Sequence, residues 1–150
     1  MTELEEKVVN YDFLKAAINR QMMRCTNKEH YKAGIFISDG GKLGTVTNII
    51  KELVENDYAE YLSDNRPVRF SAFETEVVFN NGSTLRTARG NENSRMCRFH
   101  DIIYDSEISN EIVSMVIYPI HVPYYTNDYE NNNIGTDGVR PNMRIVECII

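Results

Sequence analysis

Two stretches of the chain carry apolar residues at helical spacing. In the first, an apolar side chain recurs at each turn after Thr2 and Glu5, which match a capping box at a helix start. Its apolar positions are Leu4, Val8, Tyr11, Leu14, Ile18 and Met22. The second stretch has the clearest periodicity in the sequence, with apolar positions at Val46, Ile49, Ile50, Leu53 and Val54. We predict one helix from residue 3 to about residue 25 and another that begins near residue 45.

Short apolar runs between turn residues predict the strands of a sheet. The run 33–38 and the run 102–104 lack polar alternation and suit strands that are buried on both faces, and we expect 102–104 to be the central strand. Asn81-Gly82 is a strong hairpin signal, which predicts that its two flanking runs pair with each other. The remaining strands are assigned to residues 68–73, 74–79, 83–88 and 143–150.

Two segments near the end of the chain have less definite patterns. Residues 109–122 fit a short helix that begins at Ser109 and stops at Pro119, but their β-branched residues also suit a strand. Residues 125–142 are rich in Asn, Asp and Gly and have no periodicity. This composition predicts a mobile surface loop over residues 125–142.

The order of these elements predicts the fold class. Strands alternate with helices along the chain, as in α/β domains that hold a largely parallel sheet between helical layers. A chain of 150 residues with 42% hydrophobic residues can bury a core of its own. We therefore expect residues 1–150 to form a single α/β domain, Rossmann-like or P-loop-NTPase-like, with a three-layer sheet and a β-hairpin insertion.

Acidic residues around the run 102–104 are the first candidates for chemistry. Ligands of open α/β sheets bind at the carboxyl ends of strands, which is where Asp105 and Glu107 would lie. If the strand continues to Glu107, its even spacing places Asp101, Asp105 and Glu107 on one face, where their oxygens could bind Mg²⁺ or Mn²⁺. The alternative is structural: a core strand followed by a solvated turn whose acids cap the next helix.

A glycine-rich loop, residues 39–45, joins the first predicted strand to the second predicted helix. Backbone N–H groups at such a helix start can bind an anion. The loop does not match the P-loop motif, because Gly44 is followed directly by Thr45 and Lys42 comes two positions too early. Lys42 is still a candidate for binding a nucleotide or nucleic acid. The alternative is a tight turn whose glycines adopt positive φ.

Charge distinguishes one short segment from the rest of the chain. The formal net charge of −6 disfavours unspecific binding to nucleic-acid phosphates. Four arginines nevertheless lie close together before the acidic strand: Arg86, Arg89, Arg95 and Arg98. They indicate either phosphate recognition or ion pairs with the 22 acids of the chain. Arg95 and Arg98 are our candidates for contacting a nucleotide or nucleic acid.

Cysteine and histidine usage adds little chemistry. Cys25, Cys97 and Cys148 are odd in number and far apart, so neither a disulfide framework nor a zinc ribbon is expected. The first residues are acidic without an apolar signal core, and no run approaches the ~20 apolar residues of a membrane span. These features predict a cytoplasmic protein without membrane partners. A structural role is expected for His100 and His121.

The order of motifs from Tyr31 onward resembles one protein family. An Asn80-Asn81-Gly82 hairpin, an arginine-bearing segment from Arg95 to Arg98 and an apolar strand ending at Asp105 follow one another. This order is similar to that in the ATPase domain of large terminase subunits of tailed phages, a relative of P-loop helicases. Residues 143–150 would correspond to the core strand that comes next in that family.

The resemblance implies roles for the acids, and the chain departs from the family at three points. It implies that Asp105 holds magnesium and that the following acid positions the attacking water. Here Ser106 separates Asp105 from Glu107, Met96 stands where the family has glycine, and no upstream phosphate loop is found. Because phosphoryl transfer depends on positioning and electrostatics, these departures imply a degenerate core without turnover. A phage-derived protein of this kind would reside in the cytoplasm of a bacterial host cell.

Two classes of function follow, and we favour the first. It is a non-catalytic, terminase-like domain that needs no cofactor and binds a protein or nucleic acid, or associates with itself through its apolar carboxyl-terminal strand. The second is a Mg²⁺- or Mn²⁺-dependent nuclease or phosphohydrolase that uses Asp101, Asp105 and Glu107. A further alternative is a tyrosine-rich protein interface over residues 118–129.

Overall fold

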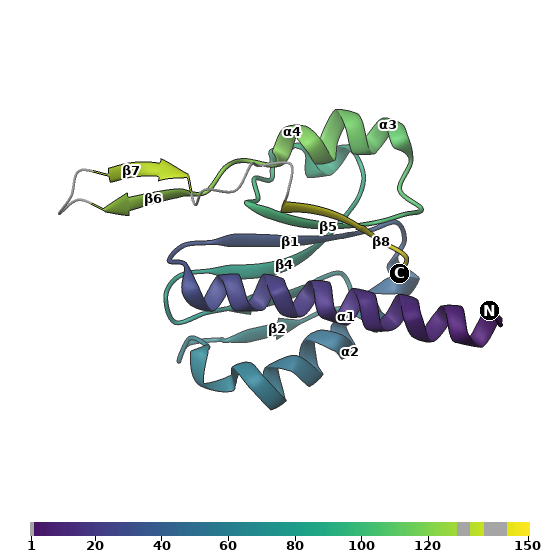
Figure 1. The fold of residues 1–150 in the computed structure, drawn as a ribbon, viewed down its shortest axis with the longest axis horizontal. Helices are drawn as coiled ribbons and strands as arrows, with labels where there is room; N and C mark the ends of the chain where they lie inside the picture. Colours follow the sequence, from purple (N-terminus) through teal and green to yellow (C-terminus); the bar gives the residue numbers. More distant parts are fainter. Residues whose placement is uncertain (1, 129–132, 137–143) are drawn as a thin grey trace.

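A six-stranded, mostly parallel sheet forms the centre of the protein in the computed structural model (Figure 1). The structure describes residues 2–128, 133–136 and 144–150. The strand order is β2-β3-β4-β1-β5-β8, in which β4, β1, β5 and β8 are parallel and β2 and β3 antiparallel. The strands are β1 (Lys32–Ile37), β2 (Val68–Phe70), β3 (Thr75–Val78), β4 (Thr84–Arg89), β5 (Asp101–Asp105) and β8 (Ile145–Cys148).

Helices cover both faces of this sheet (Figure 1). One face carries α1 (Glu3–Asn27) and α2 (Leu43–Leu53), which a π-helical turn at Val54–Tyr58 extends. The other face carries α3 (Asn110–Ile112), a π-helical turn at Val113–Ile117 and α4 (Tyr118–Ile120). This arrangement confirms the predicted three-layer, Rossmann-like α/β class. It also decides residues 109–122 in favour of a helix, which begins where the Ser109 side chain accepts a hydrogen bond from the Ile112 N–H.

The apolar stripe of α1 is buried in its second half and exposed in its first. The capping box at Thr2 and Glu5 is present, as the sequence predicted. Leu14, Ile18 and Met22 are at most 1% exposed and pack in one core with α2 and the sheet residues Ile35 and Ile103. Earlier in the same stripe, Leu4, Val8 and Tyr11 are exposed. The first turns of α1 therefore extend beyond the part of the sheet that the helix covers.

The second core lies under the short helices on the opposite face. Phe36 and Ile102 point to this side and pack with Val113, Ile117 and Ile120. The Phe99 ring meets Phe36 edge-on, with ring centroids 5.5 Å apart. β1 and β5 thus bury side chains on both faces, as their sequences predicted. β5 is an interior strand between β1 and β8, although β1 is closer to the centre of the sheet.

The predicted hairpin between β3 and β4 is confirmed and is tied to the end of α1. Gly82 has φ +85°, and it is the one glycine with positive φ in the described part of the chain. The Asn81 amide donates to the carbonyl of Cys25 at 2.8 Å, and the Ser83 hydroxyl donates to that of Lys28 at 2.5 Å.

The glycine-rich loop at residues 39–45 does not contain the positive φ angles that the sequence offered as the alternative to an anion site. Gly40–Lys42 is a 3₁₀ turn that leads into α2, so that alternative is wrong.

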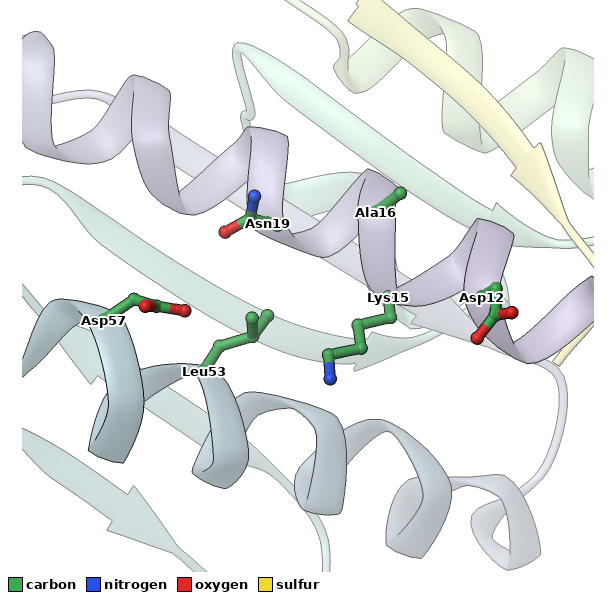
Figure 2. A pocket seen from close by; sticks show the side chains of 6 residues that line it. All are labelled: Asp12, Lys15, Ala16, Asn19, Leu53 and Asp57. Atoms are coloured by element: carbon green, nitrogen blue, oxygen red, sulfur yellow. The ribbon is translucent and has the colours of Figure 1, made fainter.

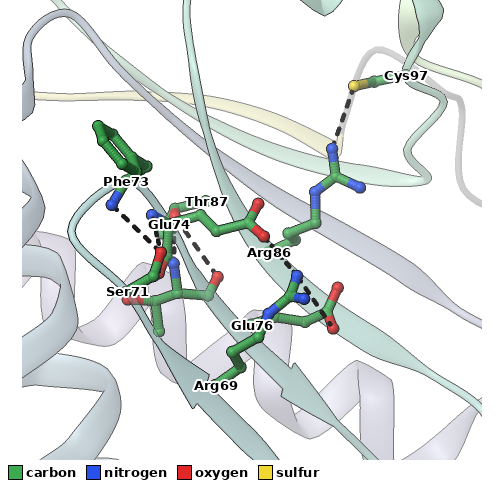
Figure 3. Close-up of polar contacts among 9 residues, drawn as sticks. Arg69, Ser71, Phe73, Glu74, Glu76, Arg86, Thr87 and Cys97 are labelled. Atoms are coloured by element: carbon green, nitrogen blue, oxygen red, sulfur yellow. Dashed lines mark hydrogen bonds and ion pairs between the residues drawn. The ribbon is translucent and has the colours of Figure 1, made fainter.

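Two strand predictions need correction. The strand expected over residues 68–73 ends at Phe70, because the Ser71 hydroxyl accepts the N–H groups of Phe73 and Glu74 and turns the chain (Figure 3). Part of the loop expected over residues 125–142 forms a two-stranded antiparallel sheet of β6 (Tyr125–Asp128) and β7 (Asn133–Thr136). The rest of that predicted loop, and the mobility expected for it, falls on residues outside the described ranges.

Replacement of Gly82 by alanine is expected to destabilise the hairpin. A left-handed backbone costs a residue with Cβ about 1–2 kcal/mol, and the added Cβ would lie 2.5 Å from Nδ1 of His30. Gly44→Ala is the matched control, because Gly44 lies in α2 with no heavy atom within 4 Å of the new Cβ. Urea unfolding should show a loss for Gly82→Ala and no loss for Gly44→Ala. Equal stability of the two variants would contradict this account of the turn.

Candidate functional site

The carboxyl ends of β1 and β5 lie side by side and define the candidate site. The two strands are parallel neighbours, with Phe36 in register with Tyr104. Ser38 follows β1 directly, and Asp105 is the last residue of β5. Ligands of open α/β sheets bind at this edge, so these two residues lie where function is expected in such a fold.

Asp105 is fully buried and accepts four hydrogen bonds. Its Oδ2 accepts from the Ser38 N–H at 3.1 Å, from the Ser38 hydroxyl at 2.5 Å and from the Lys42 ammonium at 2.7 Å. Its Oδ1 accepts from the Glu107 N–H at 3.2 Å. A buried carboxylate is tolerated only when it is paired and hydrogen-bonded, and both conditions hold here.

Lys42 reaches Asp105 because the glycine-rich loop folds as a capped turn. The Asp39 carboxylate accepts the Gly41 N–H at 2.8 Å, and the Lys42 N–H donates to the Asp39 carbonyl at 3.2 Å. The lysine side chain then points back towards β5, where its ammonium also lies 2.9 Å from Oε2 of Glu107. One lysine therefore pairs with both acids at the end of β5, and the three side chains together keep one negative charge.

The pKa values at this site shift in the direction that keeps both groups charged. Burial on its own would raise the pKa of the Asp105 carboxyl, but hydrogen bonds from Lys42 and Ser38 outweigh it and hold that pKa below its ordinary value. Burial lowers the pKa of Lys42, and its hydrogen bonds to Asp105 and Glu107 raise it further than burial lowers it. The pair is an ammonium–carboxylate ion pair at neutral pH.

Asp101, the third acid of the predicted metal site, lies at the other end of β5. Four residue steps along the strand separate it from Asp105, a distance of about 13 Å. Its carboxylate is bound by the guanidinium of Arg24 at 2.6 Å and by the hydroxyl of Tyr31 at 3.0 Å. Within the described residues, no group of three or more His, Cys, Asp or Glu side chains is arranged to hold a metal ion.

The four arginines do not form one cluster. Arg86 points along the sheet to Sγ of Cys97 at 3.5 Å (Figure 3), and its guanidinium lies 5.9 Å from the centroid of the Phe99 ring. Arg89 is the last residue of β4, and its guanidinium lies close to Gly40. A Cβ added to Gly40 would be only 3.0 Å from Nη1 of Arg89. Arg95 and Arg98 are exposed beside α4, where they line a pocket of about 180 Å³. Neither lines the site at Asp105.

A half-buried aromatic cluster at the amino end of β5, centred on the buried ring of Tyr31, is a site that the sequence pattern did not reveal. The Tyr31 ring lies 5.4 Å from the His100 ring and 5.1 Å from the Tyr124 ring, measured between centroids. His121 Nε2 is 3.0 Å from the His100 carbonyl. Burial lowers the pKa of both His100 and His121. These residues come from segments far apart in the chain, so no local motif could identify the cluster.

A larger pocket, of about 340 Å³, lies between α1 and α2 (Figure 2). It is lined by Asp12, Lys15, Ala16, Asn19, Leu53 and Asp57. Lys15 reaches across the two helices to Glu52 at 2.6 Å. The pocket is on the outer side of the helical layer and contains no residue of the Asp105 site.

Comparisons with protein-family models, with curated proteins and with solved structures find no match to this chain. No helix in the described part of the structure is both long and apolar enough to span a bilayer. Because a fold of this class hosts many activities, function has to be argued from the site itself.

Removal of the Lys42 ammonium is expected to destabilise the fold. In Lys42→Met the buried Asp105 carboxylate loses its cation, which costs about 3 kcal/mol or more when a buried pair is broken. Lys15→Met is the matched control, because the Lys15–Glu52 pair has a similar length of 2.6 Å but both side chains are more exposed. Chemical denaturation should show a much larger loss for Lys42→Met. Similar losses in the two variants would contradict the role of Lys42.

Stability should also fall on mild acidification. His100 and His121 have folded-state pKa values below the ordinary histidine value of about 6.5. As the pH falls, the unfolded chain therefore binds protons before the folded protein does. The free energy of unfolding decreases as the pH drops below about 6.5. The Asp105 pKa is lowered from 3.8, so loss of its contribution is confined to more acidic solutions.

The double variant His100→Gln/His121→Gln should show a weaker pH dependence of the free energy of unfolding between about pH 7 and pH 5, where histidine titrates. His30→Asn is the control, since His30 is exposed and asparagine tolerates its positive φ of 53°. Urea unfolding at several pH values measures the slope. An unchanged slope in the double variant would show that other groups control it.

Proposed function

We propose that this chain is a non-catalytic, terminase-like α/β domain that binds a macromolecular partner. Its defining feature is that Lys42 occupies the position of a catalytic cation. The observation that carries the proposal is the Lys42 ammonium, 2.7 Å from Oδ2 of Asp105 and 2.9 Å from Oε2 of Glu107.

The chemistry of the site supports the absence of turnover. Mg²⁺ in a phosphoryl-transfer site is bound by one or two carboxylates and the substrate phosphates. Here the ammonium already pairs with both acids at the end of β5, and Ser38 fills further acceptor positions of Asp105. A metal ion would have to displace the Lys42–Asp105 ion pair, whose side chains are 15% and 0% exposed. Binding of a metal ion at Asp105 would therefore cost the free energy of that pair.

The order and pairing of elements support the terminase-like part of the proposal. β1 leads through the 39–45 loop into α2, and the β3–β4 hairpin follows before the arginine segment. β5 then ends at Asp105, and β8 lies parallel beside it. This is the order that the family resemblance implies for a nucleotide-binding core.

Surface composition supports a role in binding. Among the described strands, β8 and β2 are the edges of the sheet and offer backbone groups to a partner strand. Several large apolar side chains are exposed, with Met96 and Phe73 more than 85% accessible. The described cysteines are free, which agrees with a reducing compartment such as the cytoplasm of a bacterial host.

Titration with Mg²⁺, Mn²⁺ and ATP tests the proposal. Wild-type protein should give no binding heat and no rise in melting temperature, because Lys42 fills the cation position. Lys42→Met should gain stabilisation by Mg²⁺ or Mn²⁺, because the vacated position leaves two carboxylates without a cation. Lys15→Met, which keeps the site intact, should show no such gain.

Turnover would contradict the proposal. If the wild-type protein hydrolyses ATP or cleaves nucleic acid with Mg²⁺ or Mn²⁺, and if Asp105→Ala abolishes that activity, the domain is the metal-dependent hydrolase that the sequence left as the second class of function. Binding of a metal ion to the wild-type protein that is lost in Asp105→Ala would also favour the metal-dependent hydrolase.

A further inference from the structure

A second apolar stripe runs along α1 on the side that faces away from the core. Its members are Val9, Phe13, Ala16 and Met23, and their intervals of three, four or seven residues keep side chains on one face of a helix. Val9 is 53% exposed, Phe13 49% and Met23 48%, and Ala16 is also exposed. The buried residues of α1, which include Leu14, belong to another face. The described part of the chain therefore leaves this outer stripe largely uncovered.

Two charged residues of opposite sign frame the outer stripe. Glu6 precedes Phe13 and Arg20 follows it, each about two helical turns away on the same face. Both charged side chains are exposed. Over the described residues, the ion pairs within 4 Å involve neither of them. Along this face, α1 is thus acidic before Phe13, apolar around it and basic after it.

This pattern is complementary to itself when one of two identical helices is reversed. In two α1 helices that cross in an antiparallel orientation near Phe13, Glu6 of each copy faces Arg20 of the other. Val9 of each copy then lies beside Ala16 of the other, whose small side chain lets the helices approach closely. A parallel pair would instead place like charges opposite each other at both ends, which is unfavourable. The sequence of this face therefore fits a second copy in one orientation.

α1 is an ordered and accessible support for such a contact. It is a single helix of 25 residues whose first turn is fixed by a capping box. Leu14, Ile18 and Met22 anchor its inner side in the core. The helix forms the outer layer on its face of the sheet and extends past the end of the sheet (Figure 1). A second copy can therefore reach the outer stripe without a change of fold.

We propose that two copies of this chain associate through the outer stripes of their α1 helices, in an antiparallel orientation about a two-fold axis near Phe13. The two Phe13 rings meet at the centre, and an ion pair between Glu6 and Arg20 forms at each end. This rests on the proposed function and deepens it, since the second copy is then the macromolecular partner. Because both copies use the same surface, assembly stops at a dimer.

The size of the contact determines the affinity that is expected. One face of a helix buries less than the ~800 Å² per partner of a standard interface, so the dimer should be weak, with a Kd of about 100 μM. The apolar residues around Phe13 supply most of the binding free energy. The two exposed ion pairs add little affinity but favour the antiparallel orientation over the parallel one.

Sedimentation equilibrium of the full chain and of charge-reversed variants tests the inference. Wild-type protein should shift from monomer to dimer as its concentration rises towards about 500 μM. Glu6→Arg and Arg20→Glu should each raise the Kd about tenfold or more, because each makes both ion pairs repulsive. The double variant Glu6→Arg/Arg20→Glu should recover the wild-type Kd. An equimolar mixture of the two single variants should form heterodimers.

Matched variants separate this contact from general effects of charge and folding. Glu55→Arg and Arg95→Glu reverse exposed charges elsewhere and should dimerise as wild type does. Phe13→Ser removes the central ring without a change of charge and should stay monomeric. Urea unfolding of each variant verifies that the fold is kept. Salt at about 0.5 M should reduce the difference in Kd between wild type and the single charge variants, because it screens exposed charges.

Other outcomes would overturn the inference. Monomeric wild type over this concentration range, single charge variants that dimerise as wild type does, or a double variant that fails to recover the wild-type Kd contradicts it. If wild type stays monomeric but binds anionic lipid vesicles, and Phe13→Ser does not, the outer stripe is a membrane-binding surface. These results are separable from the proposed function, because metal and nucleotide titrations report on Lys42 and Asp105.

Discussion

The hydrogen-bonded carboxylate of Asp105 joins the parts of the protein on which any activity would depend. It receives the backbone and side chain of Ser38 at the end of β1, the ammonium of Lys42 from the turn before α2, and the N–H of Glu107 from the turn after β5. Burial of a charge is costly, so the loop and the strand ends must keep this geometry for the core around β1 and β5 to close. The same interactions that secure the fold pair the carboxylate with an ammonium, which is why we propose a structural role for this edge of the sheet.

Most of the fold could be predicted from the sequence because it follows from local patterns. The capping box at Thr2, the stripe in α2 and the Asn81-Gly82 turn each determine an element through neighbouring residues, and the structure confirms all three. Prediction failed where side chains override such patterns. The Ser71 hydroxyl ends β2 early by accepting two backbone N–H groups, and the glycines of residues 39–45 do not need positive φ because Asp39 caps a 3₁₀ turn.

The candidate site was less predictable, because its residues meet through the sheet. The spacing of Asp101, Asp105 and Glu107 did place Asp105 at a strand end, but spacing along one strand cannot show that Asp101 is bound by Arg24 and Tyr31 about 13 Å away. Lys42 was noted for its place in an incomplete phosphate-loop motif, and only the parallel register of β1 and β5 reveals that it contacts Asp105. For the cluster of Tyr31, His100, His121 and Tyr124, the sequence predicted only a structural role for the two histidines. It could not show that these residues meet, because they are joined through the bridge between Phe99 and His121.

The central proposal is that Lys42 takes the place of a catalytic cation in a core that does not turn over substrate. Heteronuclear NMR of the lysine side chains in the wild-type protein tests it directly, because the ¹⁵Nζ and ¹³Cε signals of Lys42 report its contact with Asp105. The account predicts that these signals stay unchanged as Mg²⁺ and ATP are added to saturating amounts. A shift of the Lys42 signals towards those of solvent-exposed lysines, with saturation at a defined Mg²⁺ concentration, would show that a metal ion displaces the ammonium and would contradict the claim.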